Sequence, residues 1–294
     1  MNNHVVILGA SVSGHNIARR IREEDRDCRI TLITDEDYPA YDHLKLVDFI
    51  SGITHEDGIF LCSEEWYVNN NISFIKNKRA GAINTSKKQL YFKDKGSINY
   101  DILVISSGRS PVVPEIPGAR KRGVFRLYTL DDAKSFLKHY IASTVCVVGS
   151  DVLALKMSQV ICEKYKTEVK LLSESVFDPS LIHPDIEVIN DAAAEILGEG
   201  EVQAIKLKSG KVFGVCAVLF MGEYESNIDF LKGSDIKVDN DFVLVDGWMC
   251  TSNKDIFACG SVVKKDSIVI SLMLAGNIIN RLKDATERDA SRVG

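Results

Sequence analysis

The sequence is poor in the features that define several classes of protein. No apolar run approaches the roughly 20 residues that a membrane-spanning helix needs. Lysine and arginine are scattered along the chain and the net charge is −5, so nothing indicates a nucleic-acid-binding surface. The first apolar segment begins within a few residues of the N-terminus, which leaves no room for a secretory signal peptide. We therefore expect a cytoplasmic protein with no membrane and no nucleic-acid partner.

Closely spaced cysteines are also absent. The chain has seven cysteines, an odd number, and the nearest two, Cys250 and Cys259, have eight residues between them. Thiol–disulfide exchange through a short loop needs a closer pair. The six histidines are dispersed, and none lies at zinc-site spacing from a cysteine. The sequence therefore predicts a protein of a reducing compartment, with no metal site and no dithiol chemistry.

What the chain does contain is the composition of a globular protein, with 45% apolar and 26% charged residues. Its 294 residues are enough for two domains. Pro111, Pro114 and Pro117 mark an irregular connection, which is the best candidate for a domain boundary.

The chain is organised around a stretch near its N-terminus. Val5 to Leu8 is a short apolar run typical of a buried strand, and residues 15–24 follow with apolar side chains at helical spacing. Arg29 to Thr34 is a second strand candidate, and Asp35 and Glu36 come directly after it. This order predicts a βαβ unit with acidic residues about 20 positions beyond the turn.

The turn between this strand and this helix, GASVSG at residues 9–14, differs from the pattern G-x-G-x-x-G only in its middle glycine, which is Ser11. Such a turn lets the backbone approach a pyrophosphate at a helix N-terminus, and an acidic strand end can hold ribose hydroxyls. The alternative is an ordinary strand-to-helix turn. We predict a dinucleotide site that includes Gly9, Ser11, Val12, Ser13, Gly14, Asp35 and Glu36.

A second strand-to-turn junction lies about 140 residues further along the chain. Thr144 to Gly149 indicates a strand, Val152 to Tyr165 a helix and Glu168 to Leu172 another strand. Further short strands follow, and Ile268 to Lys283 is expected to be a closing helix. Two such units predict an α/β fold with two nucleotide-binding (Rossmann-like, three-layer) domains.

Five segments, spread from about Val5 to Leu282, have a recognisable order: VVILGASVSG, ITLITDEDYPAYDHLKL, YDILVISSGRSP, GVFRLYTLDDAKSF and DGWMCTSNKDIFACGSV. In this order the chain resembles the FAD-dependent pyridine nucleotide-disulfide oxidoreductase family, especially its rubredoxin reductase and nitrite reductase flavoprotein branch. The resemblance implies that the second domain is inserted in the first. Residues 1–112 and 240–294 would form an FAD-binding domain, and residues 113–239 a shortened, degenerate NAD(P)-binding-like domain.

The resemblance also implies further residues at the FAD site. Six of them lie at the ends of two later strands: Ser106, Ser107, Gly108, Arg109, Gly260 and Ser261. His43 and Lys45 lie in a flavin-side loop, and Ala80 is one further position. Where the family usually has an aspartate that bonds the flavin side chain, this chain has Ser261. Losing one such bond costs roughly 1–3 kcal/mol, whereas a nanomolar site has about 12 kcal/mol of binding free energy, so FAD binding is still expected.

His43 stands where relatives often have arginine or lysine, and Lys45 lies two positions on as a substitute charge. The alternative for His43 is an ordinary polar loop residue.

The second nucleotide turn, Gly149 to Ala154, keeps only its first glycine. Asp151 stands where the backbone should meet the NAD pyrophosphate, and a carboxylate about 4 Å from a phosphate charge costs roughly 4 kcal/mol at an effective dielectric constant of about 20. Lys156 replaces the family's glutamate near the nicotinamide. A helix and a strand usual in this domain also look shortened between Leu172 and Gln203. We expect a retained scaffold with weak or no use of NAD(P)H; a working NAD(P)H site is the alternative.

The resulting hypothesis is an FAD-dependent oxidoreductase that passes electrons between its flavin and a small acceptor or redox protein, such as ferredoxin, rubredoxin or flavodoxin. Many relatives continue into a separate C-terminal domain that shields the flavin. Without it, either the flavin is open to a protein partner or the chain is a fragment of a longer one. Two other functions stay open: a non-catalytic subunit or binding module with the same fold, and a conventional NADH-dependent reductase.

Overall fold

The computed structural model describes residues 3–139, 141–264 and 273–282, and it divides the chain into two compact units. Unit 1 comprises Met1–Asp42, Phe60–Arg109 and Ser226–Gly294. Unit 2 comprises His43–Ile59 and Ser110–Glu225, so it is inserted in unit 1 at two places. Among the described helices, none has the length and the apolar character that crossing a membrane requires.

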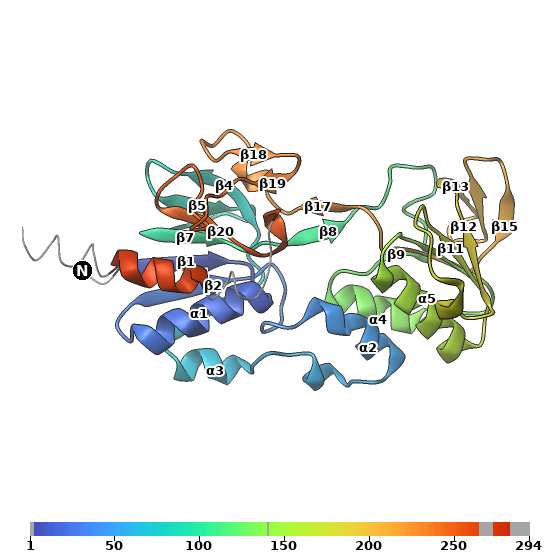
Figure 1. Ribbon diagram of the computed structural model, residues 1–294, viewed down its shortest axis with the longest axis horizontal. Helices are drawn as coiled ribbons and strands as arrows, with labels where there is room; N and C mark the ends of the chain where they lie inside the picture. The colour runs from blue at the N-terminus through green and yellow to red at the C-terminus, as the bar shows by residue number, and fades with distance from the viewer. Residues whose placement is uncertain (1–2, 140, 265–272, 283–294) are drawn as a thin grey trace, which may run out of the picture. The chain divides into compact units, whose positions relative to one another are not determined.

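Unit 1 is built on a five-stranded parallel sheet with the strand order β20-β7-β1-β2-β3. In Figure 1 the helices α1 and α3 lie on one side of this sheet, and β4, β5, β18 and β19 lie on the other. Residues 273–282 are also helical. The elements of unit 1 are β1 (His4–Leu8), α1 (Val12–Glu24), β2 (Arg29–Ile33), α3 (Glu64–Asn69), β3 (Ile72–Ile75), β4 (Ala80–Asn84), β5 (Gln89–Phe92), β6 (Ser97–Asn99), β7 (Ile102–Ile105), η4 (Asp229–Leu231), β18 (Val238–Asp239), β19 (Phe242–Val243), β20 (Ile256–Ala258) and η5 (Gly260–Val262).

Alternation along β1 places apolar side chains on both faces of the sheet. Val5 and Ile7 belong to one buried cluster, which includes the apolar face of α1 and residues of the 273–282 helix. Val6 and Leu8 belong to a second cluster with Leu90 of β5. A strand that is buried on both faces has a continuous apolar sequence, as parallel sheets require. Unit 1 therefore has three layers, with the parallel sheet in the middle.

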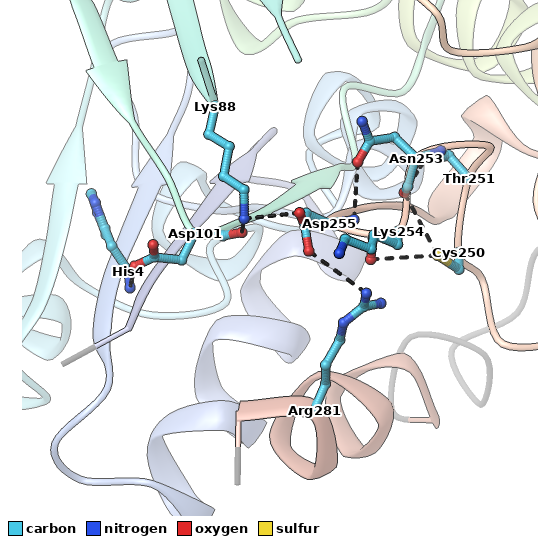
Figure 2. A network of polar contacts seen from close by, with 9 residues as sticks. All are labelled: His4, Lys88, Asp101, Cys250, Thr251, Asn253, Lys254, Asp255 and Arg281. Carbon is cyan, nitrogen blue, oxygen red and sulfur yellow. Dashed lines mark hydrogen bonds and ion pairs between the residues drawn. The ribbon is translucent and has the colours of Figure 1, made fainter. Parts of the chain in front are cut away.

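A polar network ties together the amino-terminal edge of this sheet (Figure 2). Asp255, which precedes β20, forms ion pairs with Lys88 at 2.8 Å and with Arg281 at 3.6 Å. Lys88 also donates to the main-chain oxygen of Asp101 at 3.3 Å, and the Asp101 carboxylate accepts from the backbone N–H of His4 at 2.7 Å. The network connects three strands of the sheet to the β4–β5 turn and to the 273–282 helix.

Unit 2 is built on a second five-stranded parallel sheet, with the order β12-β11-β10-β16-β9. Its elements are η1 (His43–Lys45), α2 (Leu46–Ser51), η2 (Glu56–Gly58), β9 (Val124–Arg126), α4 (Leu130–Lys138), β10 (Val145–Val148), α5 (Val152–Tyr165), β11 (Val169–Leu172), η3 (Pro179–Leu181), β12 (Ile186–Ile189), β13 (Ala193–Leu197), β14 (Ala204–Leu207), β15 (Val212–Gly214) and β16 (Ala217–Phe220). The strands β8 (Arg109–Pro111) and β17 (Tyr224–Ser226) form a two-stranded sheet where the chain passes between the units. The predicted α/β fold class with two Rossmann-like domains is confirmed.

The unit boundaries differ from the expected domain limits mainly at two places, and residues 110–112 also belong to unit 2. Residues 226–239 belong to unit 1, where η4 packs against β4. Residues 43–59 belong to unit 2, because α2 buries Leu46, Val47 and Ile50 and packs against α4 and α5. Lysine side chains of α4 and α5 also hold this segment. Lys156 donates to the Asp48 carboxylate at 2.6 Å, and Lys164 donates to the main-chain oxygen of Ile50 at 2.6 Å. Lys134 donates to the Glu56 carboxylate at 2.7 Å.

The stretch between Leu172 and Gln203 also differs from the expectation. Its strands are present, since β12 pairs with β11 and β13 pairs with β14. Between β11 and β12, however, the chain forms only the short turn η3. The loss is therefore confined to the connecting helix. Of the expected closing helix at Ile268 to Lys283, residues 273–282 are helical, and the remainder lies outside the described residues.

Candidate dinucleotide site

The carboxyl ends of the unit 1 strands bring most of the predicted residues to one edge of the sheet. Because β1, β2, β7 and β20 are parallel, the residues that follow them lie at the same edge. These are Gly9 after β1, Asp35 after β2, Ser106 after β7 and Gly260 after β20. The backbone N–H of Gly9 also donates to the Ile33 oxygen at 2.8 Å, which holds the turn against β2.

Gly9, Gly14 and Ser106 interlock so closely that neither glycine has room for a side chain. A Cβ on Gly9 would lie 2.1 Å from the backbone oxygen of Ser106, and a Cβ on Gly14 would lie 1.9 Å from the backbone oxygen of Gly9. Gly9 also has a φ of 111°, which favours glycine. The Ser106 hydroxyl donates to the main-chain oxygens of Leu8 and Gly9 at 3.0 and 3.1 Å. The packing thus brings α1 close to the ends of β1 and β7.

The N-terminus of α1 opens at this edge without a side-chain cap. Ser11 is the N-cap residue, its side chain makes no capping hydrogen bond, and the first turn of the helix contains no acidic residue. Ser13 lies in that turn beside Gly260, where a Cβ would be 3.3 Å from the Ser13 hydroxyl oxygen. The uncapped N–H groups of Val12 and Ser13, together with the positive end of the helix dipole, can bind a phosphate group.

The segment after β7 is held by residues that come much later in the chain. Asn227 donates from its backbone to the Gly108 oxygen at 2.9 Å and from its side chain to the Ser107 oxygen at 3.0 Å. Arg109 pairs with Asp241 at 3.2 Å and lies over the Phe242 ring at 4.5 Å. Neither Asn227 nor Asp241 has a local sequence signal, because each lies more than a hundred residues from its partner.

The acidic strand end after β2 separates into two environments. The Asp35 side chain is exposed at the carboxyl edge of the sheet. Glu36 is half-buried and accepts a hydrogen bond from the Tyr41 hydroxyl at 2.7 Å. The two carboxylates therefore differ, since that of Glu36 accepts a bond from Tyr41 and that of Asp35 is exposed to solvent.

Three predicted residues are not brought to this edge by contacts within unit 1. His43 and Lys45 belong to unit 2, where the His43 ring stacks on Tyr128 with centroids 5.1 Å apart and Lys45 donates to the Gly58 oxygen at 3.2 Å. Ala80 begins β4 and packs against the buried cluster that contains Val6 and Leu8. Ser261, by contrast, lies in η5 directly after Gly260 and is exposed.

The second nucleotide turn, in unit 2, has a different structure from the first. Asp151 is the N-cap residue of α5, and its carboxylate accepts from the backbone N–H of Ala154 at 2.8 Å. Burial, with a smaller contribution from the negative charge of Asp151, raises the pKa of the Tyr224 hydroxyl to about 12. The Ser150 hydroxyl accepts from the backbone N–H of Glu174 at 3.0 Å. At this helix an N–H group that could meet a phosphate is already bound to a carboxylate of the same chain.

Comparison with known proteins identifies the family. The sequence model described as "Pyridine nucleotide-disulphide oxidoreductase" matches residues 3–286. The chain belongs to this family. As a member of the pyridine nucleotide-disulphide oxidoreductases, it is 26% identical to an NADH oxidase of Methanocaldococcus jannaschii over 88% of this chain, and it spans 63% of that protein.

Two further similarities agree with this assignment. The chain is 26% identical to an NADH-rubredoxin oxidoreductase of Clostridium acetobutylicum, over 88% of this chain and 68% of that protein. The fold is similar to that of a chain in the crystal structure of the covalent putidaredoxin reductase–putidaredoxin complex. The TM-score is 0.86 at 18% identity, over 95% of this chain and 76% of the other.

The family implies FAD, and three features of unit 1 fit this cofactor. Gly9 and Gly14 leave a side-chain-free turn, in which an added Cβ would meet backbone atoms. The first turn of α1 lacks a side-chain cap. The Ser107 hydroxyl is buried and has no hydrogen-bond partner among the described residues, which suits a hydroxyl that bonds a ligand. The residues present therefore fit the diphosphate-binding edge of an FAD domain.

Proposed function

We propose that this protein binds FAD through unit 1 and passes electrons between the flavin and a small acceptor or redox protein. The observation that carries the proposal is the uncapped N-terminus of α1 beside the interlocked Gly9 and Gly14. The names of two relatives, an NADH oxidase and an NADH-rubredoxin oxidoreductase, support an oxidoreductase activity.

In this proposal FAD, when bound, supplies the redox chemistry, and the chain binds and orients it. The N–H groups of Val12 and Ser13 bind the diphosphate, and the α1 dipole offsets its negative charge. Asp35 accepts from the adenosine ribose hydroxyls. The Ser107 hydroxyl, which lacks a partner among the described residues, bonds the same ligand.

The partner in this proposal is a small iron–sulfur or flavin protein such as ferredoxin, rubredoxin or flavodoxin. Its support is the name of the rubredoxin oxidoreductase relative and the similarity in fold to a reductase solved with putidaredoxin. Encounters of this kind bury little area and bind weakly. The net charge of −5 gives no strong long-range attraction for an acidic carrier, so a local basic patch would have to guide docking.

The proposal has two candidates for the electron donor: a reduced carrier protein, with weak use of NAD(P)H, or NADH itself. The Asp151 carboxylate at the N-terminus of α5 favours weak use of NAD(P)H, because a dinucleotide would bring phosphates to a negative charge. The names of the relatives favour the second candidate, a conventional NADH-dependent reductase.

Anaerobic stopped-flow mixing of the FAD-loaded protein decides between these candidates. Slow bleaching of the flavin band by NADH together with fast bleaching by reduced ferredoxin, rubredoxin or flavodoxin supports carrier-driven transfer. Fast, saturable bleaching at micromolar NADH supports the reductase candidate. If neither NADH nor any of the carriers changes the flavin band faster than it changes that of free FAD, the electron-transfer proposal fails and a non-catalytic module is the better description.

A further inference from the structure

The turn between β18 and β19 has a backbone conformation that favours glycine but contains none. Asn240 and Asp241 are both left-handed, with φ angles of 45° and 68°. A residue with a Cβ is disfavoured in this conformation, although asparagine and aspartate tolerate it better than most others. Backbone strain of this kind persists where the surrounding structure makes use of it. The aspartate therefore indicates that its carboxylate has a role that glycine could not fill.

The Asp241 carboxylate bonds to both β8 and β17. It accepts from the backbone N–H of Ser226, the last residue of β17, at 2.7 Å. It also pairs with the guanidinium group of Arg109, the first residue of β8, at 3.2 Å. That guanidinium group lies over the ring of the neighbouring Phe242 at 4.5 Å. One carboxylate thus joins the end of β17 to the start of β8.

The residues next to these two contacts belong to the predicted cofactor site. Asn227 directly follows β17 and donates to the backbone oxygens of Ser107 and Gly108. Gly108 directly precedes β8. The Ser107 hydroxyl is buried and has no hydrogen-bond partner among the described residues. The position of this hydroxyl is therefore set by the backbone of its own segment, which Asn227 and Asp241 hold.

We propose that Asp241 is a positioning residue of the FAD site, which it affects through the Ser107–Gly108 segment and not through a bond to the cofactor. This role rests on the proposed binding of FAD by unit 1. A hydroxyl that is already held in place loses little conformational freedom when it bonds a ligand. Without the carboxylate, β8 and β17 lose their common anchor, and the Ser107 hydroxyl must bond FAD from a less ordered segment. FAD affinity should then fall although no group that contacts the cofactor has changed.

Asp241→Gly separates this role from the conformation of the turn. Because glycine suits a left-handed backbone, the substitution removes the carboxylate and relieves the strain at the same position. Asn240→Gly is the matched control, since it makes the same kind of change at the neighbouring left-handed residue, whose side chain is exposed. Both variants should stay folded, with the far-ultraviolet circular dichroism of the wild type.

The first measurement is hydrogen exchange of the Asn227 backbone amide in the protein without FAD. This amide donates to the Gly108 oxygen and not to Asp241, so it reports the order of the segment and not the deleted bond. We expect exchange at least ten times faster than in the wild type for Asp241→Gly, and an unchanged rate for Asn240→Gly. Equal rates in the two variants would show that Asp241 does not hold the segment and would overturn the proposal.

The second measurement is the dissociation constant of FAD, from the change in flavin fluorescence on titration with protein. It should rise at least tenfold in Asp241→Gly and stay unchanged in Asn240→Gly. Asp241→Asn should lie between them, because its amide oxygen can still accept from the Ser226 N–H but it has no charge to pair with Arg109. Wild-type affinity in Asp241→Gly would overturn the positioning role and leave the proposed function standing. A wild-type protein that does not bind FAD would instead refute the proposed function, and this role with it.

Discussion

Asp151 accepts a hydrogen bond from the backbone N–H of Ala154 at 2.8 Å and so caps α5 with a negative charge. In unit 1 the equivalent turn does the opposite, because Ser11 leaves the N-terminus of α1 without a side-chain cap. The two strand-to-helix turns thus offer a phosphate different environments. The first is open to an anion, and the second already contains one.

This difference predicts that Asp151→Asn strengthens NADH binding to the isolated protein. Asparagine caps a helix as well as aspartate does, so the substitution removes the charge and keeps the cap. Repulsion of about 4 kcal/mol sets the upper limit, and we expect the dissociation constant from calorimetry to fall at least tenfold. Asp178→Asn, at the N-cap of η3, is the control and should change nothing. An unchanged affinity in Asp151→Asn would mean that the charge does not limit NADH binding.

Gly14→Ala should lower both stability and FAD affinity. The new methyl group would lie 1.9 Å from the Gly9 oxygen, so α1 must move away from β1. We expect a loss of about 3 kcal/mol in the free energy of unfolding, measured with urea, together with weaker FAD binding. Gly276→Ala, in the 273–282 helix, is the matched control, because a Cβ there meets nothing within 4 Å. This variant should gain up to about 1 kcal/mol in the free energy of unfolding, since alanine favours a helix more than glycine does. Equal behaviour of the two variants would contradict the packing described for the turn.

Asp255→Asn should destabilise unit 1 through the network in Figure 2. The carboxylate is 19% exposed and lies between Lys88 and Arg281, so its removal leaves two cations without their partner. We expect a loss of about 1–3 kcal/mol in thermal or urea unfolding. Asp229→Asn breaks an ion pair with Lys232 whose side chains are 70% and 83% exposed, and should cost less than about 0.5 kcal/mol. If both variants lose the same free energy, the network adds nothing beyond a surface pair.

The stability of the protein should also depend on His15 below neutral pH. The unfolded chain protonates this histidine near pH 6.5, whereas burial in the folded state lowers its pKa to about 4. Between these values the unfolded state binds more protons, so stability present above pH 6.5 is lost as the pH falls toward 4. Wild-type protein should lose up to about 3 kcal/mol more than His15→Gln between pH 7 and pH 4. His55→Gln, at an exposed position, should follow the wild type, and parallel curves for all three proteins would refute the assignment.

The sequence was sufficient where structure follows from local patterns. The apolar run before Gly9 and the helical spacing after it predict β1 and α1, and α5 has the predicted bounds Val152–Tyr165. The edge that holds Gly9, Ser106 and Gly260 also follows, because parallel strands bring their carboxyl ends together. Local hydrophobic periodicity and glycine geometry encode these features directly.

The sequence was insufficient where a partner lies far along the chain. Nothing near Asp48 indicates that its segment packs against α5 and pairs with Lys156 in unit 2. Strand β12 is only four residues long, with Glu187 within it, and so gives a weak strand pattern. The cap that Asp151 forms on α5 differs from these cases, because an aspartate directly before a helix is a local capping signal that the expectation of charge repulsion left out.

Binding of FAD to unit 1 is the central claim, and calorimetric titration of the nucleotide-free protein with FAD tests it most directly. The account predicts saturable binding to one site at micromolar or lower concentration, with the protein turning yellow as flavin is taken up. A colourless protein that gives no binding heat with FAD at micromolar concentration would contradict it.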